Sequence, residues 1–164
     1  MDDGDGFQLE PVWLTDSFAH HSAAMAFWDR YRMLPRDVDP QSRARQIAVF
    51  GRKGDELAGI GSVVIRQMPQ VLVKLAMFRC SVAPEHRRSG LAGELGAATR
   101  DVLEAWSLAN PAQEVMGMGC VVQGPELMAK RMQPYWPITR MALAGYNDRG
   151  EQVRIVWFGH ARVG

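Results

Sequence analysis

Residues 82–93 read Val82-Ala83-Pro84-Glu85-His86-Arg87-Arg88-Ser89-Gly90-Leu91-Ala92-Gly93, and they join a long apolar run to a predicted helix. The helix is indicated by apolar residues at helical spacing, at Leu91, Leu95, Ala98, Val102 and Trp106. The first turn of a helix has N–H groups without intrahelical acceptors and lies at the positive end of the helix dipole. Gly90 and Ala92 leave room for a phosphate to reach the backbone, and Arg87 and Arg88 add charge at the rim. The stretch is therefore typical of an anion cradle, and a pyrophosphate is the ligand it fits.

Two other phosphate-binding motifs have glycine and lysine spacings that this stretch does not match. A Rossmann fingerprint spaces its glycines as Gly-x-Gly-x-x-Gly, a spacing that does not occur here. A P-loop needs Gly-Lys-Ser/Thr, and that combination is absent. The remaining alternative is a plain strand-to-helix turn with two solvated arginines.

Hydrophobic periodicity along the chain predicts one domain, residues 1–164, with residues 1–6 as a disordered tail. A first helix, capped by Thr15 or Asp16, is expected to end before Pro35. Its predicted apolar face contains Phe18, Met25 and Trp28. Strands are predicted over residues 7–14, 47–50, 57–67, 71–82, 114–122, 138–146 and 152–159, and further helices over residues 89–108 and 126–133. Short loops between successive strands indicate an antiparallel meander and a closing hairpin, so the fold class is mixed α/β with helices on the sheet faces.

The composition is that of an ordinary globular protein, with 47% hydrophobic residues, 23% charged residues and a net charge of +1. A charge so close to zero gives no overall field that recruits nucleic acid or an anionic membrane, and we expect neither partner. The apolar runs are too short to cross a bilayer and the acidic N-terminus does not resemble a signal peptide, which predicts a cytoplasmic protein. The two cysteines, Cys80 and Cys120, lack metal-ligand spacing, so we expect buried, reduced thiols and no metal site.

The loop resembles the acyl-CoA signature of the GNAT superfamily of N-acetyltransferases. That signature is Arg or Gln, two variable residues, Gly, one variable residue, and then Gly or Ala, and it is matched by Arg87, Gly90 and Ala92. The lead-in Val82-x-Pro84-Glu85-x-Arg87 is also similar to the family, and residue-level similarity is confined to about residues 79–95. The resemblance implies a GNAT-like fold, in which a central, mostly antiparallel sheet of about six to seven strands splays in the middle between flanking helices.

The same resemblance implies acetyl-CoA as the cofactor, held in a gap between the strand that ends at Val82 and the strand that ends at Val122. Splayed strands leave N–H and C=O groups free, and the amide-rich pantetheine arm can pair with them like an extra strand. Main-chain groups of Cys80 and Val82 are then expected to hold pantetheine. The pyrophosphate is assigned to the residues that follow the strand, namely Arg87, Arg88, Ser89, Gly90, Leu91, Ala92 and Gly93.

The reaction implied by the resemblance is acetyl transfer to a primary amine by direct attack in a ternary complex, without a protein nucleophile. Tyr135 is the nearest match to the tyrosine that the family often uses as the general acid for the leaving thiolate. The match is imperfect, because Glu126 and Gln133 stand where the family has an Asn at the helix start and its Tyr. A core aromatic role beside Trp136 is the alternative for Tyr135, and Tyr146 is a second candidate.

A general base is harder to assign from the sequence. The predicted strand before the loop contains Lys74 but no carboxylate, although some family members place a Glu there. Glu114, acting through water, and His86 are the candidates, and a base from elsewhere stays open. A covalent acyl-enzyme at Cys120 is a further alternative, against which stands the usual packing role of a thiol at the end of a strand.

Two other functions fit the same residues. The missing carboxylate and the displaced tyrosine also fit a catalytically degenerate acyl-CoA-binding or regulatory module. The basic segment over residues 30–45 also fits a toxin-like acetyltransferase that acts on a macromolecule. In the leading interpretation the acceptor is a small-molecule or peptide amine of unspecified identity, and the edge of the closing hairpin offers a surface for a homodimer.

Overall fold

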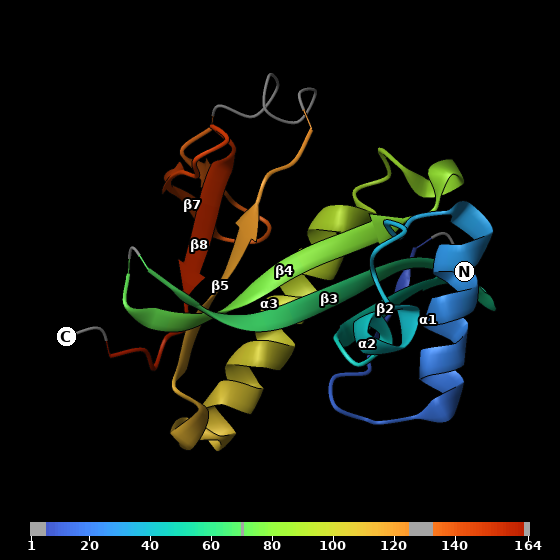
Figure 1. Ribbon diagram of the computed structural model, residues 1–164, viewed down its shortest axis with the longest axis horizontal. Coiled ribbons are helices and arrows are strands. Elements are labelled where there is room, and N and C mark those ends of the chain that lie inside the picture. The colour runs from blue at the N-terminus through green and yellow to red at the C-terminus, as the bar shows by residue number, and fades with distance from the viewer. Residues whose placement is uncertain (1–5, 70, 125–132, 163–164) are drawn as a thin grey trace. The chain divides into compact units, whose positions relative to one another are not determined.

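A computed structural model describes residues 6–69, 71–124 and 133–162 of the chain (Figure 1). Its strands form one sheet in the order β1-β2-β3-β4-β5-β8-β7-β6. The strands are β1 (Gln8–Pro11), β2 (Ile47–Lys53), β3 (Glu56–Met68), β4 (Val73–Val82), β5 (Val115–Val121), β6 (Tyr135–Trp136), β7 (Met141–Tyr146) and β8 (Gln152–Trp157). The helices are α1 (Phe18–Tyr31), α2 (Pro40–Ala44) and α3 (Leu91–Ala109), with short 3-10 helices η1 (Pro84–His86) and η2 (Pro111–Gln113).

The predicted fold class is confirmed, because β4 and β5 are parallel and the other recorded strand pairs are antiparallel. Within the described residues the sheet has eight strands, one more than the expected six to seven. The additional strand is the two-residue β6, which lies between prolines where the sequence indicated only a helix end. The predicted helix over residues 126–133 lies outside the described residues, apart from Gln133.

The chain forms two compact units. Unit 1 contains Met1–Val63 and Arg79–Val102, and unit 2 contains Val64–Phe78 and Leu103–Gly164. Three elements, β3, β4 and α3, begin in one unit and end in the other. Among the helices that the structure describes, none has both the length and the hydrophobicity that a membrane crossing requires.

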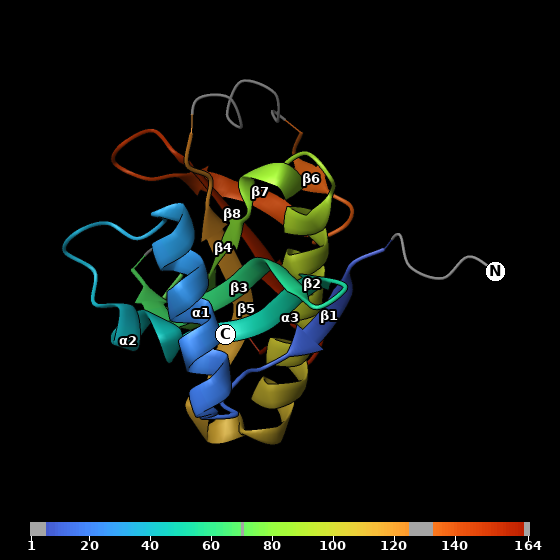
Figure 2. The same cartoon turned by 90° about the vertical axis from the view of Figure 1, so that its right-hand side faces the viewer.

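Unit 1 is a sheet covered by helices on both faces. Ile60 of β3 and Trp28 of α1 belong to one buried cluster. The neighbouring Gly59 lies against Leu91 and Leu95 of α3, since a Cβ at Gly59 would meet both side chains within 3.1 Å. Successive strand residues point to opposite faces, so α1 and the beginning of α3 pack on opposite sides of β3. Figure 2 shows this arrangement, with β2 and β3 between α1 and α3.

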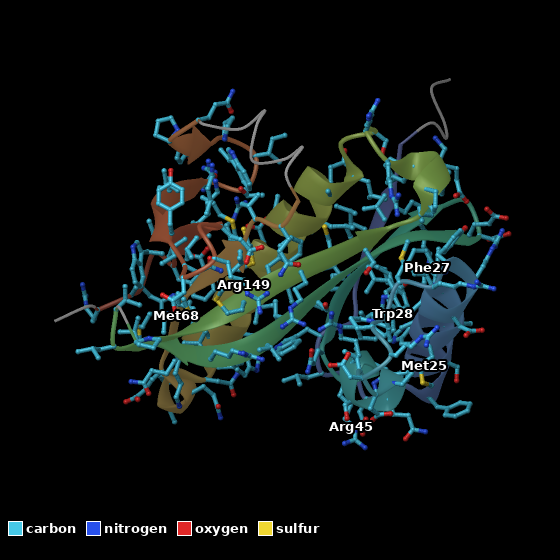
Figure 3. The ribbon with its side chains drawn as sticks, turned by 45° about the horizontal axis from the view of Figure 1, so that its top comes forward. Met25, Phe27, Trp28, Arg45, Met68 and Arg149 are labelled. Atoms are coloured by element: carbon cyan, nitrogen blue, oxygen red, sulfur yellow. The ribbon has the colours of Figure 1, made fainter. Side chains whose placement is uncertain are left out.

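The first helix starts later and buries a different face than the sequence suggested. Its N-cap is Ser17, whose Oγ accepts a bond from the His20 N–H at 3.3 Å, and not Thr15 or Asp16. Phe18 is 84% exposed, and the buried residues are Ala24, Phe27 and Trp28. Figure 3 shows Trp28 between α1 and the strands of unit 1. The sequence carries two overlapping apolar stripes on this helix, and the bulkier pair, Phe27 and Trp28, is the one that faces the core.

Unit 2 is built on the antiparallel strands β5, β8 and β7 (Figure 1). The parallel pairing of β4 with β5 is recorded for residues 74–77 and 115–119, and β4 continues beyond it to Val82. Arg154 of β8 is fully buried, donates to the Gln152 Oε1 at 2.9 Å and lies 3.9 Å from the centre of the Trp136 ring. This cation–π contact and the hydrogen bond compensate the desolvation of the guanidinium, so β6 is tied to β8.

Candidate functional site

The loop between β4 and α3 lies in unit 1 and is open to solvent. It contains the 3-10 turn η1, after which Arg88 adopts a left-handed conformation with φ 63° and Gly90 adopts one with φ 87°. Residues 87–90 are all exposed. A Cβ built on Gly90 would have no atom within 4 Å, so the space above this glycine is empty. The predicted bend is therefore neither buried nor filled by side chains.

The first turn of α3 offers backbone donors at this open bend. The Glu94 N–H bonds to the Gly90 carbonyl at 3.2 Å, which leaves the three preceding amides without an i−4 acceptor in the helix. The Leu91 N–H reaches the Ser89 Oγ at 3.4 Å, a long contact, while the Ser89 hydroxyl donates to the His86 carbonyl. The N–H groups of Ala92 and Gly93 are thus the donors most available to an anion, at the positive end of the helix dipole.

Leu91 has a different role from the rest of the predicted loop residues. Its side chain is 1% exposed and packs on the sheet, where a Cβ at Gly51 would come within 2.8 Å of the Leu91 Cδ1. Gly51 and Gly59 together leave the space that Leu91 fills. Leu91 therefore fixes the start of α3 against β2 and β3, and any contact it makes with a ligand has to use its backbone.

A hollow of about 450 Å³ lies beside the end of β4. It is lined by Tyr31, Arg32, Met33, Cys80, Ser81, Val82 and Arg87, all of which belong to unit 1. Its volume is in the range of small-molecule sites. Three of the residues that the sequence assigned to the cofactor, Cys80, Val82 and Arg87, are thus brought together on one surface.

Cys80 is exposed through this hollow, which corrects the expectation of a buried cysteine. The protein packed around the sulfur nevertheless raises the pKa of the Cys80 thiol to about 11. The thiol is therefore neutral and weakly nucleophilic near pH 7, and it offers van der Waals contact rather than chemistry. Cys120 is half-buried, and within the described residues neither cysteine forms a disulfide.

Tyr31 closes one side of the hollow and is held by Glu85. The Tyr31 hydroxyl donates to the Glu85 Oε1 at 2.8 Å, and the guanidinium of Arg30 lies 5.1 Å from the Tyr31 ring centre. The bond to Glu85 raises the pKa of Tyr31, while the backbone N–H of Glu85 and then Tyr31 lower the pKa of Glu85. The donor stays protonated and the acceptor stays ionised at neutral pH, so the bond persists across the physiological range.

Trp28 connects α1 to the strand that lines the hollow. Its side chain is 2% exposed and its Nε1–H donates to the Ser81 Oγ at 3.2 Å. This bond and the ring packing place the C-terminal end of α1 next to residues 80–82 of β4. Sequence reasoning missed the contact because it joins residues that are far apart in the chain.

Replacing Trp28 by phenylalanine should lower the free energy of unfolding by about 2 kcal/mol, because it removes this hydrogen bond and leaves a small cavity. Urea denaturation of Trp28→Phe, Ser81→Ala and the double variant measures the effect. The double variant should lose less than the sum of the single losses, because both single variants break the same bond. Fully additive losses would contradict the Trp28–Ser81 bond.

The predicted catalytic residues lie elsewhere. Tyr135 is in β6 of unit 2, 50% exposed, and pairs with Ala142 of β7. Glu114 is exposed in a left-handed conformation directly before β5, at the opposite end of that strand from Val121. His86 is half-buried, with its ring 5.4 Å from that of Phe7. The structure does not group Glu114 with Tyr135, and the roles of both residues stay predictions.

The backbone arrangement is that of known acetyltransferases. Over 96% of each chain it matches the ribosomal-protein-S5-alanine acetyltransferase from Vibrio fischeri, with a TM-score of 0.60 and 11% identity. It also matches a GNAT-family acetyltransferase from Streptococcus pneumoniae over 93% of this chain and 99% of that one, with a TM-score of 0.55 and 12% identity. A mutant AtaT toxin, bound to acetyl-CoA and to the C-terminus of the antitoxin AtaR, matches over 94% of each chain with a TM-score of 0.57 and 10% identity.

No protein-family model and no curated protein sequence matches the chain. At identities this low the structural likeness establishes the fold alone. The chain therefore has the GNAT fold, as the loop motif predicted.

Proposed function

We propose that the chain is an acetyl-CoA-dependent N-acetyltransferase that acts on a primary amine of a small molecule or peptide. The observation that carries this proposal is the exposed left-handed turn at Gly90, which leaves the first N–H groups of α3 open to an anion. The turn occurs in a GNAT fold, after a strand whose end lines a hollow of small-molecule size. A plain strand-to-helix turn does not account for the hollow beside the preceding strand.

In this proposal different residues of unit 1 bind the diphosphate and the pantetheine arm of the cofactor. The Ala92 and Gly93 amides, with Arg87 and Arg88 at the rim, fit a diphosphate. Backbone groups of residues 80–82 fit the pantetheine amides. Each charge at a helix N-terminus contributes roughly 0.3–1 kcal/mol, so the loop supplies a useful part of the roughly 8 kcal/mol that micromolar binding requires.

Acetyl-CoA, when bound, supplies the acetyl group as a thioester. The acceptor nitrogen forms a bond to the acetyl carbon, the carbon–sulfur bond breaks, and one proton passes from the amine to the departing sulfur. No oxidant or reductant is needed, and in this proposal no protein nucleophile takes part. In this proposal the Tyr135 hydroxyl delivers the proton to the sulfur, and the amine proton leaves through water. Glu114 precedes β5 at the end away from Val121 and takes no part in this step.

Calorimetric titration with acetyl-CoA and a free-thiol assay over a panel of amines test the proposal together. Binding with release of CoA on at least one amine supports an acetyltransferase. Binding without release on any amine, peptide or polyamine favours a degenerate acyl-CoA-binding module. An absence of binding at millimolar acetyl-CoA contradicts both functions.

Replacing Tyr135 by phenylalanine should lower turnover at least about tenfold, the cost of roughly 1.4 kcal/mol of transition-state stabilisation. Acetyl-CoA affinity should stay unchanged, because Tyr135 lies outside the hollow and the loop. Tyr146→Phe is the matched control, since Tyr146 is similarly exposed at 57% in the neighbouring strand β7. Equal turnover in the two variants removes the acid role from Tyr135.

A further inference from the structure

The hollow beside β4 carries a strong imbalance of charge. Two of its lining residues, Arg32 and Arg87, are guanidinium-bearing, and none of the lining residues that the structure describes is a carboxylate. By contrast, a second hollow of about 220 Å³ in unit 1 includes both Asp16 and Arg45. A concave surface lined by one sign of charge attracts the opposite charge.

We propose that Arg32 binds an anionic group of the acceptor, so that the acceptor is an amine that also carries a carboxylate, such as an amino acid. The proposal rests on the proposed acetyl transfer and specifies its substrate class. An acceptor with only ammonium groups, such as a polyamine, meets the positive charge of Arg32 in the hollow and is disfavoured.

The backbone explains why Arg32 is held at this place. Arg32 is the C-cap of α1, with φ 51° and ψ 47°, and its N–H bonds to the Asp29 and Trp28 carbonyls. A left-handed conformation is unfavourable for arginine, whereas glycine or asparagine is usual at the end of a helix. These bonds satisfy carbonyl groups at the end of α1, which reduces the negative potential that the helix end would otherwise direct into the hollow.

The neighbouring carboxylate is already engaged. Glu85 accepts the Tyr31 hydroxyl at 2.8 Å, and the described residues record no ion pair between Glu85 and Arg32. Arg32 is exposed and is one of the residues that line the hollow. Its guanidinium is thus available to a ligand and can form the paired N–H···O bonds that suit a carboxylate.

Two more arginines of unit 1, Arg43 and Arg79, lie near each other outside the hollow lining. Arg79 directly precedes Cys80, and Arg43 of α2 is half-buried. Burial and then the charge of Arg79 lower the pKa of Arg43, so the two guanidinium groups are close enough to repel each other. Neither has an ion pair recorded within the described ranges. Two further positive charges thus lie in unit 1, and one of them is next to Cys80 in the sequence.

The diphosphate cradle has its own positive charges, so the cofactor does not depend on Arg32 for its phosphates, although Arg32 and Arg87 line the same hollow. The cradle follows β4 and combines the first amides of α3 with Arg87 and Arg88. Arg32 comes from a different element, at the end of α1, and lines the hollow with residues 80–82. Loss of the Arg32 charge should therefore change the acceptor and leave the cofactor in place.

Matched acceptors test the proposal in the full chain. We expect the wild-type protein to acetylate an α-amino acid at least about tenfold more efficiently, in kcat/KM, than the carboxamide of the same amino acid, a difference of about 1.4 kcal/mol. Arg32→Gln should bring this ratio close to one by raising KM for the acid alone. Arg36→Gln, which removes an exposed arginine outside the hollow, should keep the ratio. A wild-type preference for the carboxamide or for a polyamine overturns the proposal.

Alkylation of Cys80 provides a readout that does not depend on catalysis. Iodoacetate and iodoacetamide are similar in size and differ in charge, and peptide mapping separates Cys80 from Cys120. The ratio of iodoacetate to iodoacetamide labelling at Cys80, measured near pH 9, should fall at least about threefold in Arg32→Gln and stay constant in Arg36→Gln. An unchanged ratio overturns the proposal that Arg32 gives the hollow a positive charge.

The outcomes separate this proposal from the proposed function. A charge-dependent Cys80 ratio without acetyl transfer to any amine supports the anion site and contradicts the acetyltransferase. Acetyl transfer with equal kcat/KM for the amino acid and its carboxamide supports the acetyltransferase function and overturns the proposed role of Arg32. A loss of acetyl-CoA affinity of tenfold or more in Arg32→Gln assigns the arginine to the cofactor and also overturns it.

Discussion

Replacing Gly90 by glutamate is expected to weaken acetyl-CoA binding at least ~100-fold while the fold stays in place. A carboxylate about 4 Å from a bound phosphate repels it by roughly 4 kcal/mol at an effective dielectric constant near 20, and a hundredfold loss needs only about 3 kcal/mol. Screening by solvent reduces the repulsion at so exposed a loop. The new side chain also covers the N–H groups of the first turn of α3, and this adds to the loss.

The chain offers a matched control for this variant in Gly54, at the turn between β2 and β3 of the same unit. Gly54 also has a positive φ, of 58°, and a Cβ there would also have no atom within 4 Å. Gly54→Glu thus introduces the same charge and a similar backbone strain, of about 1–2 kcal/mol, away from the loop. Gly90→Asn tests the strain alone, because asparagine tolerates the left-handed conformation and adds no charge.

Calorimetric titration should show wild-type affinity in Gly54→Glu and at most a tenfold loss in Gly90→Asn. Thermal unfolding should show similar midpoints for Gly90→Glu and Gly54→Glu, because both carry the same strain. Unchanged acetyl-CoA affinity in Gly90→Glu would remove the cofactor assignment. Equal loss in the two glutamate variants would attribute the effect to net charge rather than to the cradle.

The loop was predictable from the sequence because its parts are contiguous. A buried strand, a basic glycine turn and an amphipathic helix follow one another within residues 71–108, and each is specified by local pattern and backbone preference. The meander of β2, β3 and β4 was predictable for the same reason, since short polar turns separate its strands. The loop and the meander depend little on contacts with distant parts of the chain.

The hollow was not predictable, because it depends on contacts between distant segments. Arg32 lines the hollow as the left-handed C-cap of α1, a conformation that the sequence does not predict for an arginine. Tyr31 is held at the hollow by its hydrogen bond to Glu85, which is distant in the sequence. Cys80 reads as a core residue at the end of an apolar run, yet it is exposed where α1 and β4 leave space between them. The loop's backbone therefore follows the sequence prediction, because it depends on local preferences, whereas its role in binding stays a prediction. Tyr31 and Arg32, which α1 and its C-cap supply to the hollow, were not predicted from the sequence.

The error on α1 has a similar origin. Phe18 and Met25 form one apolar stripe with Trp28, and Phe27 and Trp28 form part of another, so helical periodicity alone does not choose between them. In the structure the stripe with Phe27 and Trp28 is buried. Ser17 rather than an earlier residue caps the helix, and Phe18 is exposed to solvent. Capping and packing together decide which stripe is buried.

Replacing Gly117 by alanine should lower the free energy of unfolding by about 3 kcal/mol, the upper range for overpacking in a closely packed site. Gly117 lies in β5, opposite Trp157 of β8, and a Cβ there would be 2.5 Å from the Val156 carbonyl oxygen and 3.3 Å from the Trp157 Cα. Both obstacles are backbone atoms of the paired strand. The clash can be relieved only by moving β5 away from β8, which weakens hydrogen bonds of the ladder.

Gly119, two residues further along the same strand and paired with Ile155, is the control. A Cβ at Gly119 would meet the Met77 Sδ at 3.0 Å, and the flexible thioether can move aside, although the Arg154 carbonyl lies 3.3 Å away. Alanine also reduces the entropy of the unfolded chain by about 0.4–1 kcal/mol, so Gly119→Ala should stay within about 1 kcal/mol of wild type. In thermal unfolding Gly117→Ala should lose roughly 6–12 °C. Equal stability of the two variants would mean that moving the β5 and β8 backbones apart costs no more free energy than moving the Met77 side chain. That result would contradict the close approach of these strands at Gly117.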